Sequence, residues 1–380
     1  MTLARSEQID LNATPYYHVM NRCVRRSFLC GYDELTKTDY SHRKTWIVDR
    51  LRYLTDIFAI KICAYAIMSN HYHVVLYVEE TQAQAWSEAE IIRRWASIFP
   101  KDAEENKHLK QKIQLWKERL TSISWFMRCL NEKIARDVNE EDDTAGRFWE
   151  GRFKSQALLD EGALLSAMVY VDLNPVRAGI TKTPEKSEFT SIYERIQHIS
   201  KQLKVNKPKS IKQLKREKAN IYPQQMILRL GGKRSSNRSV YKIHDYCEIR
   251  EANNTEDSSV KGIYNNLTQP KSLVPFANIS EHHSHAIDFK LVDYLELVDY
   301  TGRTIREDKE AGSIPEHLAP ILTRLQFEPM NWISLVKNLA KSFSHAVGSE
   351  ILLLNFGKGG RKGLKGITWA KKLYSSTHVA

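Results

Sequence analysis

Apolar residues in the first half of the chain follow two periods, one typical of strands and one typical of helices. Short apolar runs at 16–20, 59–67 and 71–78 predict strands, and Ser69-Asn70 predicts a tight connection between the last two. Apolar positions at helical spacing extend over 44–58, 83–98, 123–138 and 162–174. This order of elements favours an α+β domain in which helices cover an antiparallel sheet.

Two further stretches of the chain are unusually rich in charged residues. The charged stretch 101–120 continues a helical pattern and is expected to be a solvated insertion. Residues 201–218 are dense in lysine, which is typical of a linker with electrostatic reach to DNA. We therefore expect an α+β domain over 1–200, a basic and polar region over 201–285, and a mainly helical C-terminal domain over 286–380.

Two histidines interrupt one of the predicted strands. His71 and His73 are two residues apart, so on a strand both side chains lie on the same face. Two imidazoles on one face are half of a metal site. The pattern His-x-His alone is more often a packing or surface feature, so the metal hypothesis needs further donors.

Such donors are present in a later predicted helix. Tyr170 and Asn174 are spaced i, i+4 and share a face if the helix continues to Asn174, the last helical position that Pro175 allows. A tyrosine directed at a metal-bound phosphate is a candidate nucleophile, and an amide oxygen one turn later is a candidate ligand. Tyr170 by itself would more often be a core aromatic residue.

Charge favours a polyanionic partner. The formal net charge is +12, and the segment 146–155 interleaves arginine and lysine with aromatic residues. Phosphate pairing and base stacking are the contacts expected of such a segment, although a Phe-Trp pair is also typical of a hydrophobic plug. The predicted DNA contacts are Arg22, Arg25, Arg147, Phe148, Trp149, Arg152, Lys154 and Arg177.

Several classes of protein are disfavoured. The five cysteines contain no Cys-x-x-Cys pair, which predicts ordinary thiols in a reducing compartment. The first 15 residues have no apolar segment of a signal peptide, and no stretch approaches the length of a membrane span. We expect a cytoplasmic, nucleoid-associated protein with no membrane partner.

The ordered set of these motifs resembles a known family. His71-Tyr72-His73 is similar to the His-hydrophobic-His (HUH) signature of single-tyrosine nucleases. Together with Met68-Ser69-Asn70, Phe148-Trp149-Glu150-Gly151-Arg152 and the Tyr170-x-x-x-Asn174-Pro175 ending, it resembles the REP-associated tyrosine transposases. The resemblance covers about the first half of the chain. The C-terminal third is similar to the extension of a long-chain subgroup.

The resemblance implies a fold and a reaction. The fold would be a ferredoxin-like antiparallel sheet with the histidine pair on a central strand. His71, His73 and Asn174 would hold Mg²⁺ or Mn²⁺ against single-stranded hairpin DNA, and Tyr170 would attack the scissile phosphate. The products would be a 5′-phosphotyrosine and a free 3′-hydroxyl, so that rejoining needs no ATP.

Some alternatives stay open. Phe153 stands where many relatives have tyrosine, but the spacing to Asn174 favours Tyr170 as nucleophile. Two histidines suit manganese or zinc better than magnesium. The oligomeric state, monomer or homodimer, is undetermined. A domesticated relative that binds hairpins without cutting is the alternative function, whereas a β-lactamase-type metallohydrolase is excluded because Val74-Val75 stand where an Asp-His pair is required.

Overall fold

The centre of the molecule is a mixed sheet. The computed structural model describes residues 8–24, 29–34, 37–104, 109–205, 268–277, 286–305, 329–358 and 364–374. Within these ranges the sheet has the strand order β4 (Ile60–Ile67), β5 (His71–Val78), β1 (Tyr16–Arg22), β6 (Lys154–Leu158) and β7 (Ala346–Val347). The first four strands are antiparallel to their neighbours, and β7 is parallel to β6.

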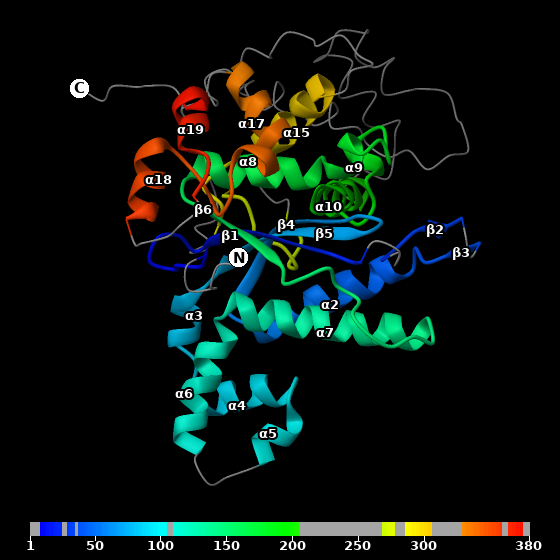
Figure 1. The fold of residues 1–380 in the computed structure, drawn as a ribbon, viewed down its shortest axis with the longest axis vertical. Coiled ribbons are helices and arrows are strands. Elements are labelled where there is room, and N and C mark those ends of the chain that lie inside the picture. Colours follow the sequence, from blue (N-terminus) through cyan, green and yellow to red (C-terminus); the bar gives the residue numbers. More distant parts are fainter. Residues whose placement is uncertain are drawn as a thin grey trace, which may run out of the picture.

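Helices cover both faces of this sheet, as Figure 1 shows. One face carries α2 (Arg43–Ile57) and α7 (Ile123–Glu141). The other face carries α8 (Glu161–Asp172), α9 (Asn174–Arg177), α10 (Ser191–Val205), α15 (Leu291–Ile305) and α17 (Pro329–Ser342), with α18 (Glu350–Gly357) and α19 (Ile367–Leu373) beside them. The predicted α+β class is confirmed. Every predicted strand and helix of the first half has a counterpart, although 83–98 divides into α3 (Glu80–Gln84) and α4 (Glu88–Ala96).

Strand register decides which residues face α8. His73 lies opposite Ala66 on β4 and opposite Met20 on β1, and His18 lies opposite Gln156 on β6. Paired residues of an antiparallel sheet share a face, so the three imidazoles of His18, His71 and His73 gather on the side of α8. The small side chain of Ala66 leaves α8 room to approach this face.

The C-terminal block is part of the same fold, which corrects the expectation of a separate helical domain over 286–380. Strand β7 extends the central sheet, with Ala346 paired to Ala157, and α15 and α17 pack on α8. Residues 268–277, expected in the polar linker, also join the core: the Val274 N–H donates to the Ile62 carbonyl at 2.8 Å. The lysine-rich run beyond 205 lies outside the described residues.

The helix over 162–174 is interrupted, which corrects the expectation that Tyr170 and Asn174 share one continuous helix. Helix α8 ends at Asp172, and α9 begins at Asn174, because Pro175 has no N–H and restricts the residue before it. Leu173 links the two helices with φ −88° and ψ 1°. Its N–H still donates to the Val169 carbonyl at 3.0 Å, and the Arg177 N–H donates to the Leu173 carbonyl at 2.9 Å.

The predicted insertion, 101–120, is part of a group of helices that projects from the α2–α7 face, seen at the bottom of Figure 1. It comprises α3, α4, α5 (Pro100–Glu104) and α6 (Leu109–Leu120). It is not solvated throughout: Trp116 of α6 is buried and stacks on Trp95 of α4 with ring centroids 5.8 Å apart. An amphipathic helix pair with its own aromatic contact explains why the stretch is rich in both charge and apolar residues.

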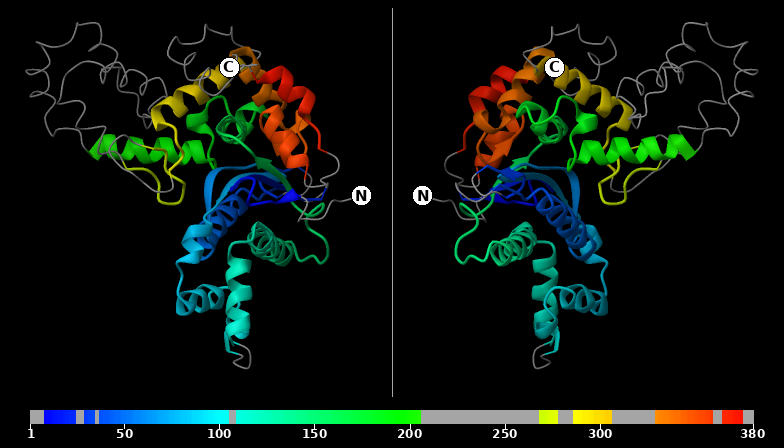
Figure 2. Two further views of the ribbon diagram at one scale, coloured as in Figure 1. Left: turned by 90° about the vertical axis from the view of Figure 1, so that its left-hand side faces the viewer. Right: turned by 90° about the vertical axis from the view of Figure 1, so that its right-hand side faces the viewer.

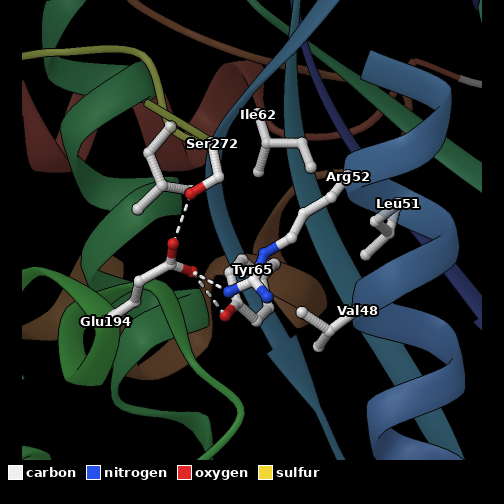
Figure 3. Close-up of a pocket in the computed structure, with 8 residues that line it drawn as sticks. Val48, Leu51, Arg52, Ile62, Tyr65, Glu194 and Ser272 are labelled. Atoms are coloured by element: carbon white, nitrogen blue, oxygen red, sulfur yellow. Dashed lines mark hydrogen bonds and ion pairs between the residues drawn. The ribbon is translucent and has the colours of Figure 1, made fainter. Parts of the chain in front are cut away.

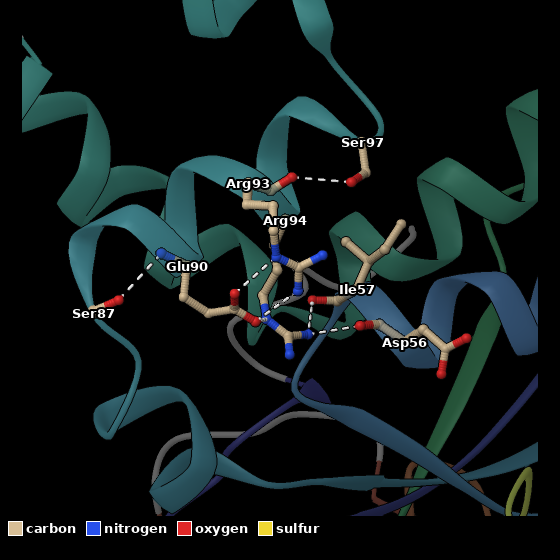
Figure 4. A network of polar contacts seen from close by, with 7 residues as sticks. All are labelled: Asp56, Ile57, Ser87, Glu90, Arg93, Arg94 and Ser97. Atoms are coloured by element: carbon tan, nitrogen blue, oxygen red, sulfur yellow. Dashed lines mark hydrogen bonds and ion pairs between the residues drawn. The ribbon is translucent and has the colours of Figure 1, made fainter.

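A polar network ties this insertion to the end of α2 (Figure 4). Arg94 of α4 donates from Nη1 to the carbonyls of Asp56 and Ile57 at 2.7 and 2.9 Å. Glu90 accepts from Arg93 and Arg94, and the Ser87 hydroxyl caps α4 by accepting from the Glu90 N–H. The Arg94 guanidinium thus satisfies the last carbonyls of α2, which have no partner within that helix.

Helix α10 was not predicted, and Figure 3 shows how it is attached. Its Glu194 accepts from the Tyr65 hydroxyl at 2.8 Å and pairs with Arg52 of α2 at 3.2 Å. Ser272 also donates to Glu194. The space between these side chains has no room for a water molecule. This junction is therefore structural.

Candidate metal and phosphate site

The two histidines of β5 lie together at the edge of the α8 layer. Their ring centroids are 5.0 Å apart, with His73 only 2% exposed and His71 half-buried at the start of the strand. The Nδ1 of His71 is 2.6 Å from Oδ1 of Asn70, and an amide oxygen can only accept. His71 therefore carries its proton on Nδ1 and has a lone pair on Nε2.

His73 is hydrogen-bonded to a third histidine. Its Nδ1 lies 2.9 Å from Nε2 of His18, and the two rings stack with centroids 5.1 Å apart. The Nδ1 of His18 lies 2.9 Å from Oε1 of Gln156, which in turn donates from Nε2 to the Phe343 carbonyl at 3.1 Å. All of these side chains are buried, so their hydrogen bonds are shielded from water.

Burial keeps the three imidazoles neutral. It lowers the pKa of His18 to about 4, against a smaller opposite effect of the Gln156 hydrogen bond. It also lowers the pKa of His71 to about 4, with help from the charge of Arg22. The pKa of His73 falls well below its usual value for the same reason, aided by His18, His71 and Arg177. A neutral imidazole keeps the lone pair that a metal ion requires.

Tyr170 lies over this cluster. It projects from α8, and its ring centroid is 5.6 Å from that of His73 and 5.9 Å from that of His18. The Arg177 guanidinium packs over the Tyr170 ring, 4.4 Å from its centroid, and donates to the Lys337 carbonyl of α17 at 2.9 Å. The structure thus brings Tyr170 to the predicted histidine pair. Among the described residues its hydroxyl has no hydrogen-bond partner.

Asn174 begins α9, four residues after Tyr170. The side chain is buried, and its Nδ2 atom has no hydrogen-bond partner in the described part of the chain. No hydrogen bond joins it to His71 or His73 within those residues. Buried amides are nearly always satisfied, so an orphaned one marks a polar group that a ligand could complete.

The donor chemistry of this cluster fits a divalent cation. His71 and His73 each have a free Nε2 lone pair, and a 180° rotation of the Asn174 amide exchanges its nitrogen for an oxygen. In the described ranges there is no group of three or more His, Cys, Asp or Glu able to hold a metal. An ion bound here would therefore complete its shell with the amide, a phosphate or water.

The predicted aromatic DNA contacts are corrected by the structure. Phe148 is 4% exposed and Trp149 is 9% exposed, so neither ring offers a face to a base. Trp149 packs edge-on against Tyr72 with centroids 5.6 Å apart, and its indole N–H donates to the Asn131 carbonyl of α7 at 2.9 Å. The two rings plug the α7 face of the sheet, the alternative that the sequence left open.

The predicted basic contacts have different surroundings. Arg22, Arg152 and Lys154 are exposed. Arg147 is exposed too, but its guanidinium donates to the carbonyls of Trp149 and Glu150 and shapes its own loop. Arg25 lies outside the described residues.

A hollow of about 200 Å³ lies beside the site. Its lining includes Met68, just before the histidine strand, and Pro175, just after Asn174. Lys44 and Lys186 contribute two positive charges to the wall, Glu188 contributes one negative charge, and Phe189 contributes an aromatic ring. Phe189 has a φ of 60°, a conformation that is unfavourable for an aromatic residue.

Sequence reasoning missed His18, Gln156 and the contribution of the C-terminal block. His18 lay in a predicted strand, and a histidine between apolar residues at 17 and 19 was a usable signal. Gln156 could not be found in this way, since strand β6 was not predicted. Its contact with Phe343 spans 187 positions.

No family model matches the chain. No curated protein matches it either. Among solved structures, it is similar to a REP-associated tyrosine transposase bound to a REP hairpin, at 11% identity and a TM-score of 0.31, over 48% of this chain and 79% of that chain. At this level of likeness, the geometry of the site is the basis for assigning a function. No helix in the described ranges is long and apolar enough to cross a membrane.

Proposed function

We propose that the chain is a metal-dependent endonuclease and strand transferase of the single-tyrosine HUH type, acting on single-stranded hairpin DNA. The observation that carries the proposal is the position of Tyr170, whose ring lies 5.6 Å from that of His73, itself beside His71. These residues are about 100 positions apart in sequence. Their convergence supports a nucleophile and metal donors at one place, and the amide of Asn174, four residues after Tyr170, has an Nδ2 atom without a partner among the described residues.

The reaction would proceed by attack of the Tyr170 phenol oxygen on a backbone phosphorus. An O–P bond forms to the tyrosine while the bond from phosphorus to the 3′-oxygen breaks. The phenol loses its proton to solvent, and the leaving 3′-oxygen takes one up. The product is a 5′-phosphotyrosine, whose energy is similar to that of the broken bond, so a 3′-hydroxyl can reverse the step.

The metal would be Mg²⁺ or Mn²⁺, held by His71, His73 and Asn174. When bound, such an ion supplies a Lewis acid that stabilises negative charge on the phosphate. The chain itself contributes neutral imidazoles whose Nδ1 protons are engaged elsewhere. Arg177 holds the Tyr170 ring from the other side and adds positive charge close to where the phosphate would lie.

DNA binding would depend on the exposed cations around the site and on the net charge of +12. Arg22 lies opposite His71 in the strand register and so lies at the mouth of the site. The hollow near Pro175, with Lys44 and Lys186 in its wall, would accept a nucleotide next to the scissile phosphate. The order of the four long strands, β4-β5-β1-β6, supports a ferredoxin-like sheet of the HUH type.

The test is formation of a covalent adduct with labelled single-stranded hairpin DNA in the presence of Mn²⁺. The native chain should give a denaturant-stable species of reduced mobility, and Tyr170→Phe should give none while retaining hairpin binding. The matched control is Tyr53→Phe: Tyr53 is a partly exposed tyrosine of α2, on the opposite face of the sheet.

Two results would overturn the proposal. An adduct with Tyr170→Phe would show that the nucleophile is another residue. Tight hairpin binding by the native chain without any adduct would favour the alternative function, a domesticated protein that binds hairpins and does not cleave them. Loss of the adduct in Tyr53→Phe would indicate a general loss of folding.

A further inference from the structure

A buried chain of hydrogen bonds leads from the C-terminal block to the candidate site. It passes from the Phe343 carbonyl to Gln156, from Gln156 to His18, and from His18 to His73. The three links measure 3.1, 2.9 and 2.9 Å. Gln156 and His18 face each other across strands β6 and β1, and His73 is on the next strand, β5.

The carbonyl of Phe343 determines the direction of each of these three hydrogen bonds. The Phe343 carbonyl can only accept, so the Gln156 amide must present its NH₂ group there and its oxygen to His18. That oxygen can only accept, so the His18 proton is on Nδ1. Neutral His18 then has a lone pair on Nε2, and it must accept the Nδ1 proton of His73.

We infer that His18 and Gln156 are positioning residues that hold His73 in its Nδ1–H tautomer, with the Nε2 lone pair free for a metal. Orienting a metal-binding histidine through its other ring nitrogen is a general way to set tautomer and ring angle. The use of His73 as a ligand depends on the proposed function. Its tautomer in the metal-free chain does not.

His18 is not itself a third metal ligand. Both of its ring nitrogens are occupied, one by Gln156 and one by His73. It is 3% exposed and stacks on His73, and both of its hydrogen-bond partners are on the neighbouring strands β6 and β5. Its two contacts are those of a residue that acts through a neighbour.

This inference gives the C-terminal block a role at the site. The segment after α17 is placed by β7, which pairs with β6 next to Gln156, and by a 2.8 Å bond from the Ala157 N–H to the His345 carbonyl. Phe343 is thereby presented to the Gln156 amide. The block also reaches the site through the Lys337 carbonyl, which accepts from Arg177.

The test is nitrogen NMR of histidine-labelled, metal-free protein, with the His73 signals assigned by their loss in His73→Gln. The native chain should show one slowly exchanging Nδ1–H tautomer for His73, with a protected Nδ1 proton. An Nε2–H tautomer, or an averaged mixture of both, would overturn the inference. This measurement needs neither DNA nor activity, so its failure is distinct from failure of the proposed function.

Two variants extend the test to metal binding. His18→Phe keeps a ring of similar size but removes the acceptor for His73, and Gln156→Leu removes the acceptor for His18. Both variants should give mixed His73 tautomers. Both should also weaken Mn²⁺ binding, measured by electron paramagnetic resonance, by about 10–100-fold. The control is Ser155→Ala on the same strand as Gln156, β6. It removes the 3.2 Å hydrogen bond from Ser155 to Gln8 and leaves the relay intact.

The outcomes separate the two proposals. Folded His18→Phe or Gln156→Leu protein with the native tautomer and native Mn²⁺ affinity would overturn the relay. If the native chain shows the expected tautomer but binds no Mn²⁺, the relay stands and the metal-dependent function fails. If neither variant folds, the tautomer of the native chain still decides the question.

Discussion

Replacement of Trp149 by alanine tests whether the basic-aromatic segment is part of the core or part of a DNA surface. The indole is 9% exposed, packs on Tyr72, and donates its N–H to Asn131. Removing a buried tryptophan of this kind costs about 3–5 kcal/mol in the free energy of unfolding, from lost transfer and the cavity that remains. Trp149→Phe keeps a ring against Tyr72 but loses the hydrogen bond, so its cost should be near 1 kcal/mol.

The assay is denaturant unfolding, paired with hairpin binding measured where all variants are folded. The control is Lys154→Ala, an exposed cation of the same segment, whose free energy of unfolding should change by no more than about 0.5 kcal/mol. We expect Trp149→Ala to lose stability and keep its affinity for DNA. Unchanged stability together with a loss of about 1–3 kcal/mol in binding, the amount typical of base stacking, would refute the burial argument.

Three further results are expected. His71→Ala and His73→Ala should each abolish cleavage by removing a metal donor while hairpin binding persists, and full activity of either variant at low Mn²⁺ would contradict the metal site. Burial raises the pKa of Asp172 to about 6, so the folded chain holds a proton that the unfolded chain releases above about pH 4. Its contribution to stability is complete below about pH 4 and is lost as pH rises through about 6. Asp172→Asn should flatten the pH dependence of the free energy of unfolding over this range, and an unchanged pH dependence would contradict the raised pKa of Asp172. Hairpin affinity should fall about 10³–10⁵-fold between 50 and 200 mM salt if 6–10 phosphates are contacted, and a salt-independent affinity would exclude phosphate pairing as its source.

Local patterns predicted the parts of the fold and site that depend on local spacing. The short apolar run over 71–78 predicted the strand that carries His71 and His73, and this strand lies inside the sheet. The apolar run before Tyr170 identified the helix that places this ring over the histidines. Each of these features depends on residues less than a dozen positions apart, so it could be predicted from the sequence alone.

Long-range features could not be predicted in the same way. Strand β7 has two residues, and its pairing with β6 joins segments almost 190 positions apart. The hydrogen bond from Gln156 to the Phe343 carbonyl depends on that pairing. The burial of Trp149 was ambiguous, because aromatic residues between arginines look the same in a plug and in a stacking platform. The contacts of Trp149 with Tyr72 of β5 and Asn131 of α7, both distant in sequence, show that the ring is buried.

The measurement that most directly tests the central claim is identification of the residue that carries DNA after reaction. The native chain would be incubated with hairpin DNA and Mn²⁺, digested with nuclease and protease, and its peptides sequenced by mass spectrometry. We predict a 5′-phosphonucleotide on the Tyr170 phenol oxygen. A modification at any other side chain, or unmodified Tyr170 in protein that has cleaved its substrate, would contradict the assignment of this tyrosine and its histidine pair as the active centre.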